Sequence, residues 1–318
     1  MSIRWVVRAG EDATIGDVVA RAGGDARAIE EGRVFIGRRR VRVPTELARS
    51  GDELTIAPAR AASASDEPAI AILARAGDIV IVDKPAGIPT IPDHSGASHS
   101  LVALTARALG VDVSRVHPTS RLDREVSGAV TFALSPRAAA HLTRAREQGA
   151  YERRYVAIAG CPPSPAIGTW NAPIGRASDP RHRAPFGKDA VAAETRFQTV
   201  ARLERAALLA LAPLTGRTHQ LRVHASHAGA PLLGDRTYGG LLRATLATGR
   251  VVPIRRIALH AARVVVPRAP GAGRVFRGDG DANSSLVALS PIPKDLAELW
   301  LSLGGDPIAW DIAVSCPL

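Results

Sequence analysis

The sequence predicts an α/β protein of the α+β kind, with a mixed, mostly antiparallel sheet, flanking helices and a small α/β unit before it. Three observations favour this fold. Many short runs of Val, Ile, Leu and Ala are bounded by Gly, Pro and Asp, which is typical of strands. Few helix-length segments separate these runs, so most neighbouring strands are expected to pair antiparallel. A small polar stretch at residues 61–68 indicates a linker between two units.

The composition combines enough apolar material for a sizeable core with a strong positive charge. Of 318 residues, 46% are hydrophobic and only 4% aromatic, so the expected core consists mainly of Val, Leu, Ile and Ala. The 41 basic and 30 acidic residues give a net charge of +11. This balance favours a polyanionic partner, with nucleic acid ahead of an acidic membrane surface. Coding bias explains the excess of Arg over Lys but not the sign of the charge.

Cysteine usage and hydropathy exclude several classes of protein. The two cysteines, Cys161 and Cys316, follow no metal-binding spacing and predict no disulfide framework. No 18-residue apolar run or signal-peptide core occurs, so we expect neither a membrane span nor secretion. The expectation is a cytoplasmic protein.

Residues 1–60 are expected to form a compact unit. Thr14 is placed to cap a short helix that ends at Gly23, and a second short helix follows. Short apolar runs on either side of a basic turn at 37–40 predict a hairpin. This order of elements resembles the small RNA-binding domain shared by ribosomal small-subunit proteins and some tRNA synthetases. A small structural appendage is the alternative.

Residues 69–300 are expected to form the larger domain, followed by a C-terminal tail at 301–318. Its first strands flank the turn at 77–78, and a Pro-rich extended segment follows. Thr218 is placed to cap a helix that carries the apolar face of Leu221 and Ala225. Helices are predicted at 101–110, 136–148, 219–228 and within 290–305.

The most informative residue is Asp123. Pro118 argues against a helix, and the alternating run 129–134 predicts a strand, so Asp123 is expected in a loop that leads into this strand. Its neighbours Arg121 and Arg124 favour an ionised carboxylate, which suits nucleophilic or electrostatic work. A solvated surface cluster is the ordinary alternative for such a charge group.

Motifs around Asp123 resemble those of a known family. The sequence RLDREVSG at 121–128 is similar to the RLDxxTSG signature of the RluA-type pseudouridine synthases, in which the Asp is catalytic. DKPAG at 83–87 resembles a segment upstream of that Asp, and residues 213–240 resemble GRTHQxRVH…G.P..GD..Y nearly letter for letter. These motifs occur in the family's order over roughly residues 70–300.

The resemblance implies isomerisation of a uridine in rRNA or tRNA, with RNA as partner and no cofactor. It implies that Arg222 pairs with Asp123 and that Tyr155, which opens a strand after Arg153-Arg154, packs against the target base. A half-buried strand Tyr is the alternative. We expect no membrane partner and a monomer. The candidate RNA contacts are Arg121, Lys188, Arg217 and His219.

Several alternatives stay open. Ser120 and Val126 depart from the family pattern and favour a catalytically silent RNA-binding paralogue. A glycoside-type hydrolase would use Asp123 with Glu125, but two carboxylates in one loop rarely reach the required separation. Three His in one segment raise a metal site, but no acidic ligand follows at a standard spacing, so none is expected. Whether Asp123 would attack the ribose or remove a proton from it is undecided.

Overall fold

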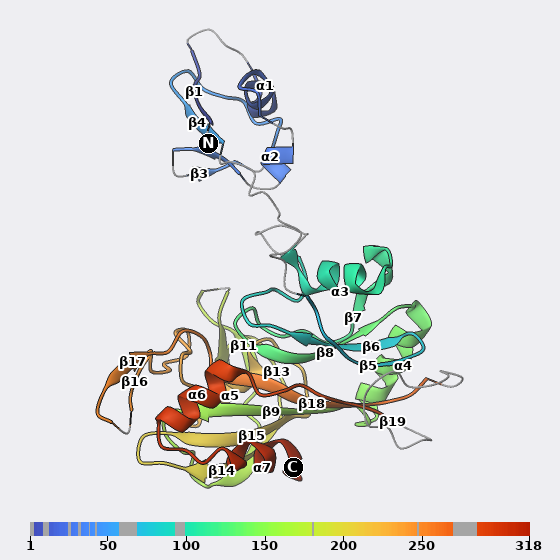
Figure 1. Ribbon diagram of the computed structural model, residues 1–318, viewed down its shortest axis with the longest axis vertical. Coiled ribbons are helices and arrows are strands. Elements are labelled where there is room, and N and C mark those ends of the chain that lie inside the picture. Colours follow the sequence, from blue (N-terminus) through green and yellow to red (C-terminus); the bar gives the residue numbers. More distant parts are fainter. Residues whose placement is uncertain are drawn as a thin grey trace.

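The computed structural model describes most of the chain (Figure 1). The expected linker at 61–68 lies outside the described residues. These are residues 3–8, 13–24, 27–30, 33–37, 39–41, 43–56, 69–92, 99–179, 181–246, 248–269 and 285–318.

The first part of the chain forms a small sheet of its own. Its elements are β1 (Ile3–Val6), α1 (Ile15–Arg21), α2 (Arg27–Glu30), β2 (Val34–Ile36), β3 (Arg39–Arg40) and β4 (Glu53–Ile56). The strand order is β1-β4-β2-β3, and Ile15, Val18 and Leu54 lie in its core. Thr14 caps α1 as expected, in a capping box with Asp17. Within the described residues none of these strands pairs with the larger sheet.

A ten-stranded sheet dominates the rest of the chain. Its strands are β5 (Ile72–Ala76), β6 (Ile79–Lys84), β7 (His117–Pro118), β8 (Ser127–Ala133), β9 (Glu152–Ala159), β10 (Ile167–Trp170), β14 (Thr195–Arg202), β15 (Ala207–Pro213), β18 (Leu259–Pro267) and β19 (Ser285–Leu289). The order is β10-β14-β15-β9-β18-β8-β6-β5, with β19 paired to β18 and β7 to β8. Only the β18–β8 pair is parallel in this described sheet, which confirms the mixed, mostly antiparallel fold.

The parallel pair depends on a glycine. Gly128 on β8 is opposite Ala261 on β18, and its φ of 120° is unfavourable for residues with a side chain. A Cβ at Gly128 would lie 2.3 Å from the Ala261 carbonyl oxygen. The SG at the end of the RLDREVSG motif therefore lets the two central strands approach closely, directly after the Asp123 loop.

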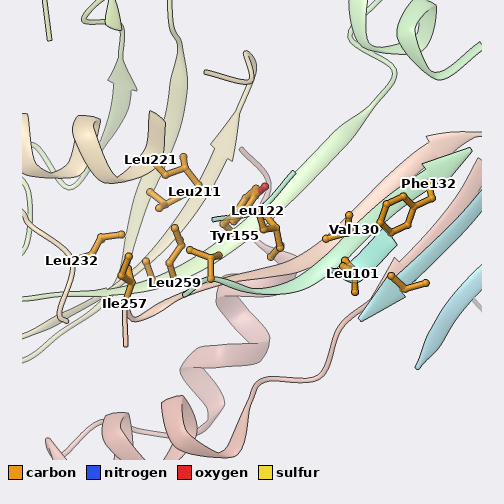
Figure 2. Close-up of a cluster of buried hydrophobic side chains, with 14 of the residues drawn as sticks. Leu101, Leu122, Val130, Phe132, Tyr155, Leu211, Leu221, Leu232, Ile257 and Leu259 are labelled. Carbon is orange, nitrogen blue, oxygen red and sulfur yellow. The ribbon is translucent and has the colours of Figure 1, made fainter. Parts of the chain in front are cut away.

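Helices cover both faces of the large sheet (Figure 1). They are α3 (Leu101–Leu109), α4 (Pro136–Glu147), α5 (Gln220–His227), α6 (Lys294–Ser302) and α7 (Ile308–Ser315). Val130 and Phe132 on β8 share a buried cluster with α3 and α5, whereas Ala129 and Ala133 point to the opposite face and pack with α4. Figure 2 shows the first cluster, which includes Tyr155.

The segment 301–318, expected as a tail, is packed against the core. Helix α7 buries Trp310 and Ala313 against the sheet face that carries Val156 on β9 and Leu208 on β15. Trp300 at the end of α6 is fully buried, and its indole N–H donates to the Asp306 carbonyl oxygen at 2.9 Å. An apolar sheet face must be covered, and here the last helix covers it.

Two smaller sheets extend from this body. One contains β11 (Ile174–Arg176), β12 (Arg183–Pro185) and β13 (Lys188–Val191) in the order β12-β11-β13, and the other is the hairpin of β16 (Arg243–Thr245) and β17 (Val251–Pro253). A short 3₁₀ helix spans Val113–Arg115. Across the described ranges, no helix combines the length and apolar character needed to span a membrane.

Candidate active site

A cleft of about 500 Å³ lies where the Asp123 loop meets the loop that precedes α5. Tyr155 on β9 and Leu259 on β18 contribute to its wall, and Arg146 and Arg153 also line it. The cleft brings together chain segments about a hundred residues apart. It contains Asp123, Tyr155 and Arg222, the three residues expected to be catalytic.

The Asp123 loop is held by buried residues on both sides. Asp123 precedes β8 as expected, and its carbonyl oxygen accepts a hydrogen bond from Val126 N at 3.0 Å. Leu122 and Val126 are buried in the apolar cluster, whereas the Asp123 side chain is 27% exposed. The loop is thus anchored at two apolar points, between which the carboxylate reaches the cleft.

The segment after β6 fixes the main chain of this loop. The Lys84 ammonium is fully buried and donates to the carbonyl oxygens of Pro85 (3.1 Å), Arg124 (3.1 Å) and Val126 (2.6 Å). Burial lowers the pKa of Lys84 to about 7. The Thr90 hydroxyl donates to the Leu122 carbonyl oxygen and accepts from Leu122 N. The DKPAG segment therefore supports the loop through the buried ammonium group of Lys84.

Arg222 on α5 links Asp123 to a second carboxylate. Its Nη1 donates to Asp123 Oδ2 at 2.7 Å, while Nε and Nη2 donate to the two oxygens of Asp235 at 2.7 and 2.9 Å. Burial alone would lower the pKa of Arg222, but the hydrogen bonds and charges of Asp235 and Asp123 outweigh burial and raise it. Arg222 is 6% exposed, so its orientation is fixed by these contacts.

Asp235 is the site residue that sequence reasoning missed. It is fully buried and also accepts hydrogen bonds from the backbone N–H groups of Thr237 (3.1 Å) and Tyr238 (3.2 Å). Its signal was present in the GD..Y part of the motif, to which no role was attached. Asp235 holds the face of Arg222 that points away from Asp123.

His219 directly precedes α5, and the expectation that Thr218 caps this helix is wrong. The N-cap is His219, in the left-handed conformation with φ of 58° and no side-chain capping bond. Its Nδ1 lies 2.7 Å from the Tyr238 hydroxyl, and its Nε2 lies 3.8 Å from Asp123 Oδ2. Burial lowers the pKa of His219. The Tyr238 ring lies over the Arg222 guanidinium, 4.9 Å from its carbon.

The turn before His219 is organised by Gln220. Its Oε1 accepts from the Thr215 hydroxyl (2.7 Å) and from Arg217 N (2.9 Å), and its Nε2 donates to the Glu194 carbonyl oxygen (2.9 Å). This network places Arg217 at the cleft. The Gln of the THQ letters thus organises the turn, because a buried amide can satisfy donors and acceptors on both sides of it.

The four expected RNA contacts separate into two groups. Arg121, Arg217 and His219 line the cleft, together with Asp123. Lys188 does not line it, because it lies on the exposed strand β13. Its assignment as an RNA contact stays a prediction.

Tyr155 is buried in the wall of the cleft, with 7% of its surface exposed. Burial raises the pKa of its phenol above the ordinary value, so the group is neutral at physiological pH. Arg153, two residues earlier, donates to the carbonyl oxygens of Pro213 (3.0 Å) and Thr215 (2.9 Å). The same strand therefore carries an apolar aromatic surface and a cation that fixes the opposite loop.

His224 on α5 is engaged in hydrogen bonds through both ring nitrogens. His224 Nδ1 lies 3.0 Å from the Thr195 hydroxyl, and its Nε2 donates to the Ala172 carbonyl oxygen at 2.9 Å. Both ring nitrogens of this buried side chain are thus in use. In the part of the chain that the structure describes, no three His, Cys, Asp or Glu side chains gather in a metal-binding arrangement.

Comparison with a protein family and comparison with individual sequences point to the same class of protein. Residues 78–227 match the family model described as RNA pseudouridylate synthase. "Uncharacterized RNA pseudouridine synthase YhcT" of Bacillus subtilis (strain 168) is 35% identical over 235 residues, or 72% of this chain and 70% of that protein. "Ribosomal large subunit pseudouridine synthase C" of Escherichia coli (strain K12) is 27% identical over 281 residues, or 82% of this chain and 84% of the relative.

Solved structures share the fold. "Human RNA Pseudouridylate Synthase Domain Containing 4" superposes with a TM-score of 0.54 at 22% identity, over 74% of this chain and 93% of that one. "Human RNA Pseudouridylate Synthase Domain Containing 1" gives a TM-score of 0.51 at 24% identity, over 76% and 96%.

Proposed function

The chain belongs to the RluA-type RNA pseudouridine synthases and is thus an isomerase of uridine in RNA; we propose that Asp123 is its catalytic residue and that it modifies specific uridines in structured rRNA or tRNA. The observation that carries the proposal is the 2.7 Å ion pair of Asp123 with the buried Arg222, in a cleft that Tyr155 also lines. The name of the Escherichia coli relative, a ribosomal large subunit pseudouridine synthase, favours ribosomal RNA as the first substrate to test.

The reaction needs a fixed anionic group and little else. The bond between uracil N1 and ribose C1′ breaks, the base turns, C5 joins C1′, the C5 proton leaves and N1 gains a proton. No redox change occurs. Asp123 can attack C1′ or remove a proton from the ribose, and in either route its carboxylate must be ionised and oriented. Arg222 holds the orientation of this carboxylate through a charge-assisted hydrogen bond.

Tyr155 acts on the base in this proposal. Its ring gives the flipped uracil an apolar surface in the cleft, as base-modifying enzymes require. Because burial raises the pKa of its phenol, Tyr155 is neutral when the base arrives. It therefore packs and passes a proton at C5 through its hydroxyl, rather than acting as a standing anion.

Cleft arginines bind the RNA backbone in the same proposal. Arg121, Arg146 and Arg217 lie within one cleft and supply positive charge toward the phosphates of a bound strand. Lys188, on β13 outside the cleft, extends this surface.

The alternatives have less support. Val126, which departs from the family pattern, is buried in the apolar cluster, and the Ser120 hydroxyl accepts from Thr131 N at 3.2 Å, so both residues fit the loop. A silent paralogue is therefore not favoured by them. Glu125 is exposed and does not line the cleft, which argues against a two-carboxylate hydrolase with Asp123.

The domain organisation belongs to the same proposal. Residues 1–60 act as a small RNA-binding domain, joined by the linker at 61–68 to the catalytic domain, and the protein works as a cytoplasmic monomer. The separate core of the four-stranded sheet supports the boundary. Sedimentation of the purified protein with and without RNA tests the monomer.

The decisive experiment compares wild type with Asp123→Asn on total RNA from a strain that lacks the gene. Wild type should form pseudouridine at one or a few sites, and Asp123→Asn should form none while binding the same RNA with nearly equal affinity. Glu125→Gln is the matched control from the same loop and should turn over as wild type does. Equal turnover by wild type and Asp123→Asn would remove Asp123 from the mechanism, and a wild type that binds but never turns over would favour the silent paralogue.

A further inference from the structure

The pair formed by His219 and Tyr238 has no part in the reaction described so far. Tyr238 follows Asp235 by three residues, and its hydroxyl lies 2.7 Å from His219 Nδ1. The other ring nitrogen of His219 faces the Asp123 carboxylate. Both rings lie beside the Arg222–Asp123 ion pair. The position of their protons therefore determines whether the Asp123 carboxylate faces a hydrogen-bond donor or an acceptor.

The hydrogen bonds of Tyr238 favour one tautomer of His219. The backbone N–H of Arg183 on β12 donates to the Tyr238 hydroxyl oxygen at 3.0 Å, and a backbone N–H can only donate. The hydroxyl oxygen therefore accepts there, and its single proton is left for His219 Nδ1. In the opposite tautomer the hydroxyl oxygen would accept at both of these contacts, and the hydroxyl would donate at neither. A neutral imidazole that accepts at Nδ1 carries its hydrogen at Nε2.

This tautomer presents a donor to Asp123. His219 Nε2 lies 3.8 Å from Asp123 Oδ2, the same oxygen that accepts from Arg222 Nη1 at 2.7 Å. Among the described residues none donates a hydrogen bond to Oδ1. One carboxylate oxygen thus faces two N–H donors of the protein, and the other remains available to a ribose. The 3.8 Å separation exceeds a hydrogen bond, and catalytic hydrogen bonds commonly shorten when substrate fills the site.

We propose that Tyr238 is a positioning residue, which fixes His219 as an Nε2–H donor toward Asp123 so that the carboxylate presents one defined oxygen to the RNA. The inference rests on the proposed catalytic role of Asp123. It also gives β12 a function, because the Arg183 backbone supplies the hydrogen bond that directs the Tyr238 proton.

Tyr238→Phe tests the proposal with a single hydroxyl. The phenyl ring keeps its place over Arg222, and only the hydrogen bonds to His219 and Arg183 are lost. The single-turnover rate on saturating RNA should fall about tenfold, the equivalent of one modest hydrogen bond, with unchanged RNA affinity. The matched control is Tyr151→Phe, because the Tyr151 hydroxyl is buried and has no hydrogen-bond partner among the described residues. It should keep the wild-type rate.

A spectroscopic measurement reads the tautomer directly. In ¹⁵N–¹H ring correlation spectra of the free protein, His219 is assigned as the signal that is missing from His219→Gln. Wild type and Tyr151→Phe should show Nε2 protonated and Nδ1 bare, whereas Tyr238→Phe should show a mixture of tautomers. A wild-type His219 with its proton on Nδ1 would overturn the proposal.

Rescue by an amide separates positioning from general packing. The Gln amide nitrogen reaches the place of His Nε2, and the Asn amide reaches only the place of Nδ1. His219→Gln should retain activity within a few-fold and become insensitive to a second change, Tyr238→Phe, whereas His219→Asn should lose activity. Asn tolerates the left-handed backbone of position 219 better than Gln, so a merely structural effect would favour the wrong variant.

The outcomes distinguish this inference from the proposed function. If Asp123→Asn turns over like wild type, the role of Asp123 fails, while the tautomer spectra still report on the hydrogen-bond chain. If Asp123→Asn is inactive but Tyr238→Phe has the wild-type rate, or if Tyr238→Phe slows His219→Gln as much as wild type, only the positioning role of Tyr238 fails.

Discussion

Asp235→Asn should destabilise the protein by about 3 kcal/mol, because it removes the charge from a buried ion pair. The Asp235 side chain is 1% exposed and that of Arg222 is 7% exposed, so solvent screens their interaction little. Asp235 accepts two hydrogen bonds from Arg222 and two from backbone N–H groups. Asn keeps one acceptor oxygen, but its NH₂ group is a donor and would face the N–H donors of Arg222 or of the backbone. Breaking a buried pair costs about 3–5 kcal/mol. Because Asn retains one acceptor oxygen, we expect the lower end of this range.

The matched control is Asp295→Asn. Asp295 also binds an arginine with both oxygens, Arg256 at 2.6 and 2.8 Å, but its side chain is 58% exposed. Because water screens an exposed pair, this change should cost less than about 1 kcal/mol. The two variants therefore share geometry and differ in burial.

Urea denaturation at pH 7, followed by the fluorescence of the four tryptophans, measures both losses. Adding Arg222→Met to Asp235→Asn should cost less than the sum of the two single changes, because both single changes break the same buried ion pair. Equal losses for Asp235→Asn and Asp295→Asn, or strict additivity with Arg222→Met, would refute the argument from burial. Asp235→Asn should also slow turnover, since Arg222 then loses its fixed orientation.

Three further changes test the support of the Asp123 loop. Because burial lowers the pKa of Lys84 to about 7, the unfolded chain binds up to one more proton than the native protein between that pH and about 10. Wild type should therefore gain stability relative to Lys84→Met as the pH rises from about 7 toward 10, and urea midpoints at two pH values in this window measure the gain. Gly128→Ala should cost more than about 3 kcal/mol of stability, because its Cβ would meet backbone at 2.3 Å. The control Gly149→Ala also has a positive φ but lies in open space, so it should cost about 1 kcal/mol. Comparable shifts in melting temperature for the two variants would contradict this reasoning. Thr90→Val keeps the shape but removes both hydrogen bonds to Leu122, so turnover should fall while RNA affinity, measured by filter binding, is kept.

The amino-acid sequence alone determined the local elements around the site. The helices expected at 101–110 and 136–148 are present as α3, which Ser100 caps and which ends at Gly110 in the left-handed conformation, and as α4, which Pro136 opens. Asp123 lies in a loop before a strand for the reasons visible in the letters around it. Caps, glycines and apolar periodicity act within a few residues, so the sequence carries them openly.

Family resemblance, rather than the pattern of residues, led to the pairing of Arg222 with Asp123. The two lie 99 positions apart, and no local rule brings α5 to the loop before β8. Their contact follows from the parallel pairing of β8 with β18 and from the central place of β9, which are decided by packing across the whole sheet.

The tertiary structure alone decided which polar groups are buried and what satisfies them. Lys84 and Asp235 look like ordinary surface charges in the sequence, yet both are fully buried, one against three carbonyl oxygens and the other against Arg222. The segment that forms helix α7 likewise gave no functional signal in the sequence, and in the structure it covers one face of the large sheet. Burial depends on which faces pack together, and a chain read residue by residue does not contain that information. Only the assembled sheet and its helices turn these side chains inward, where an unpaired charge would be costly.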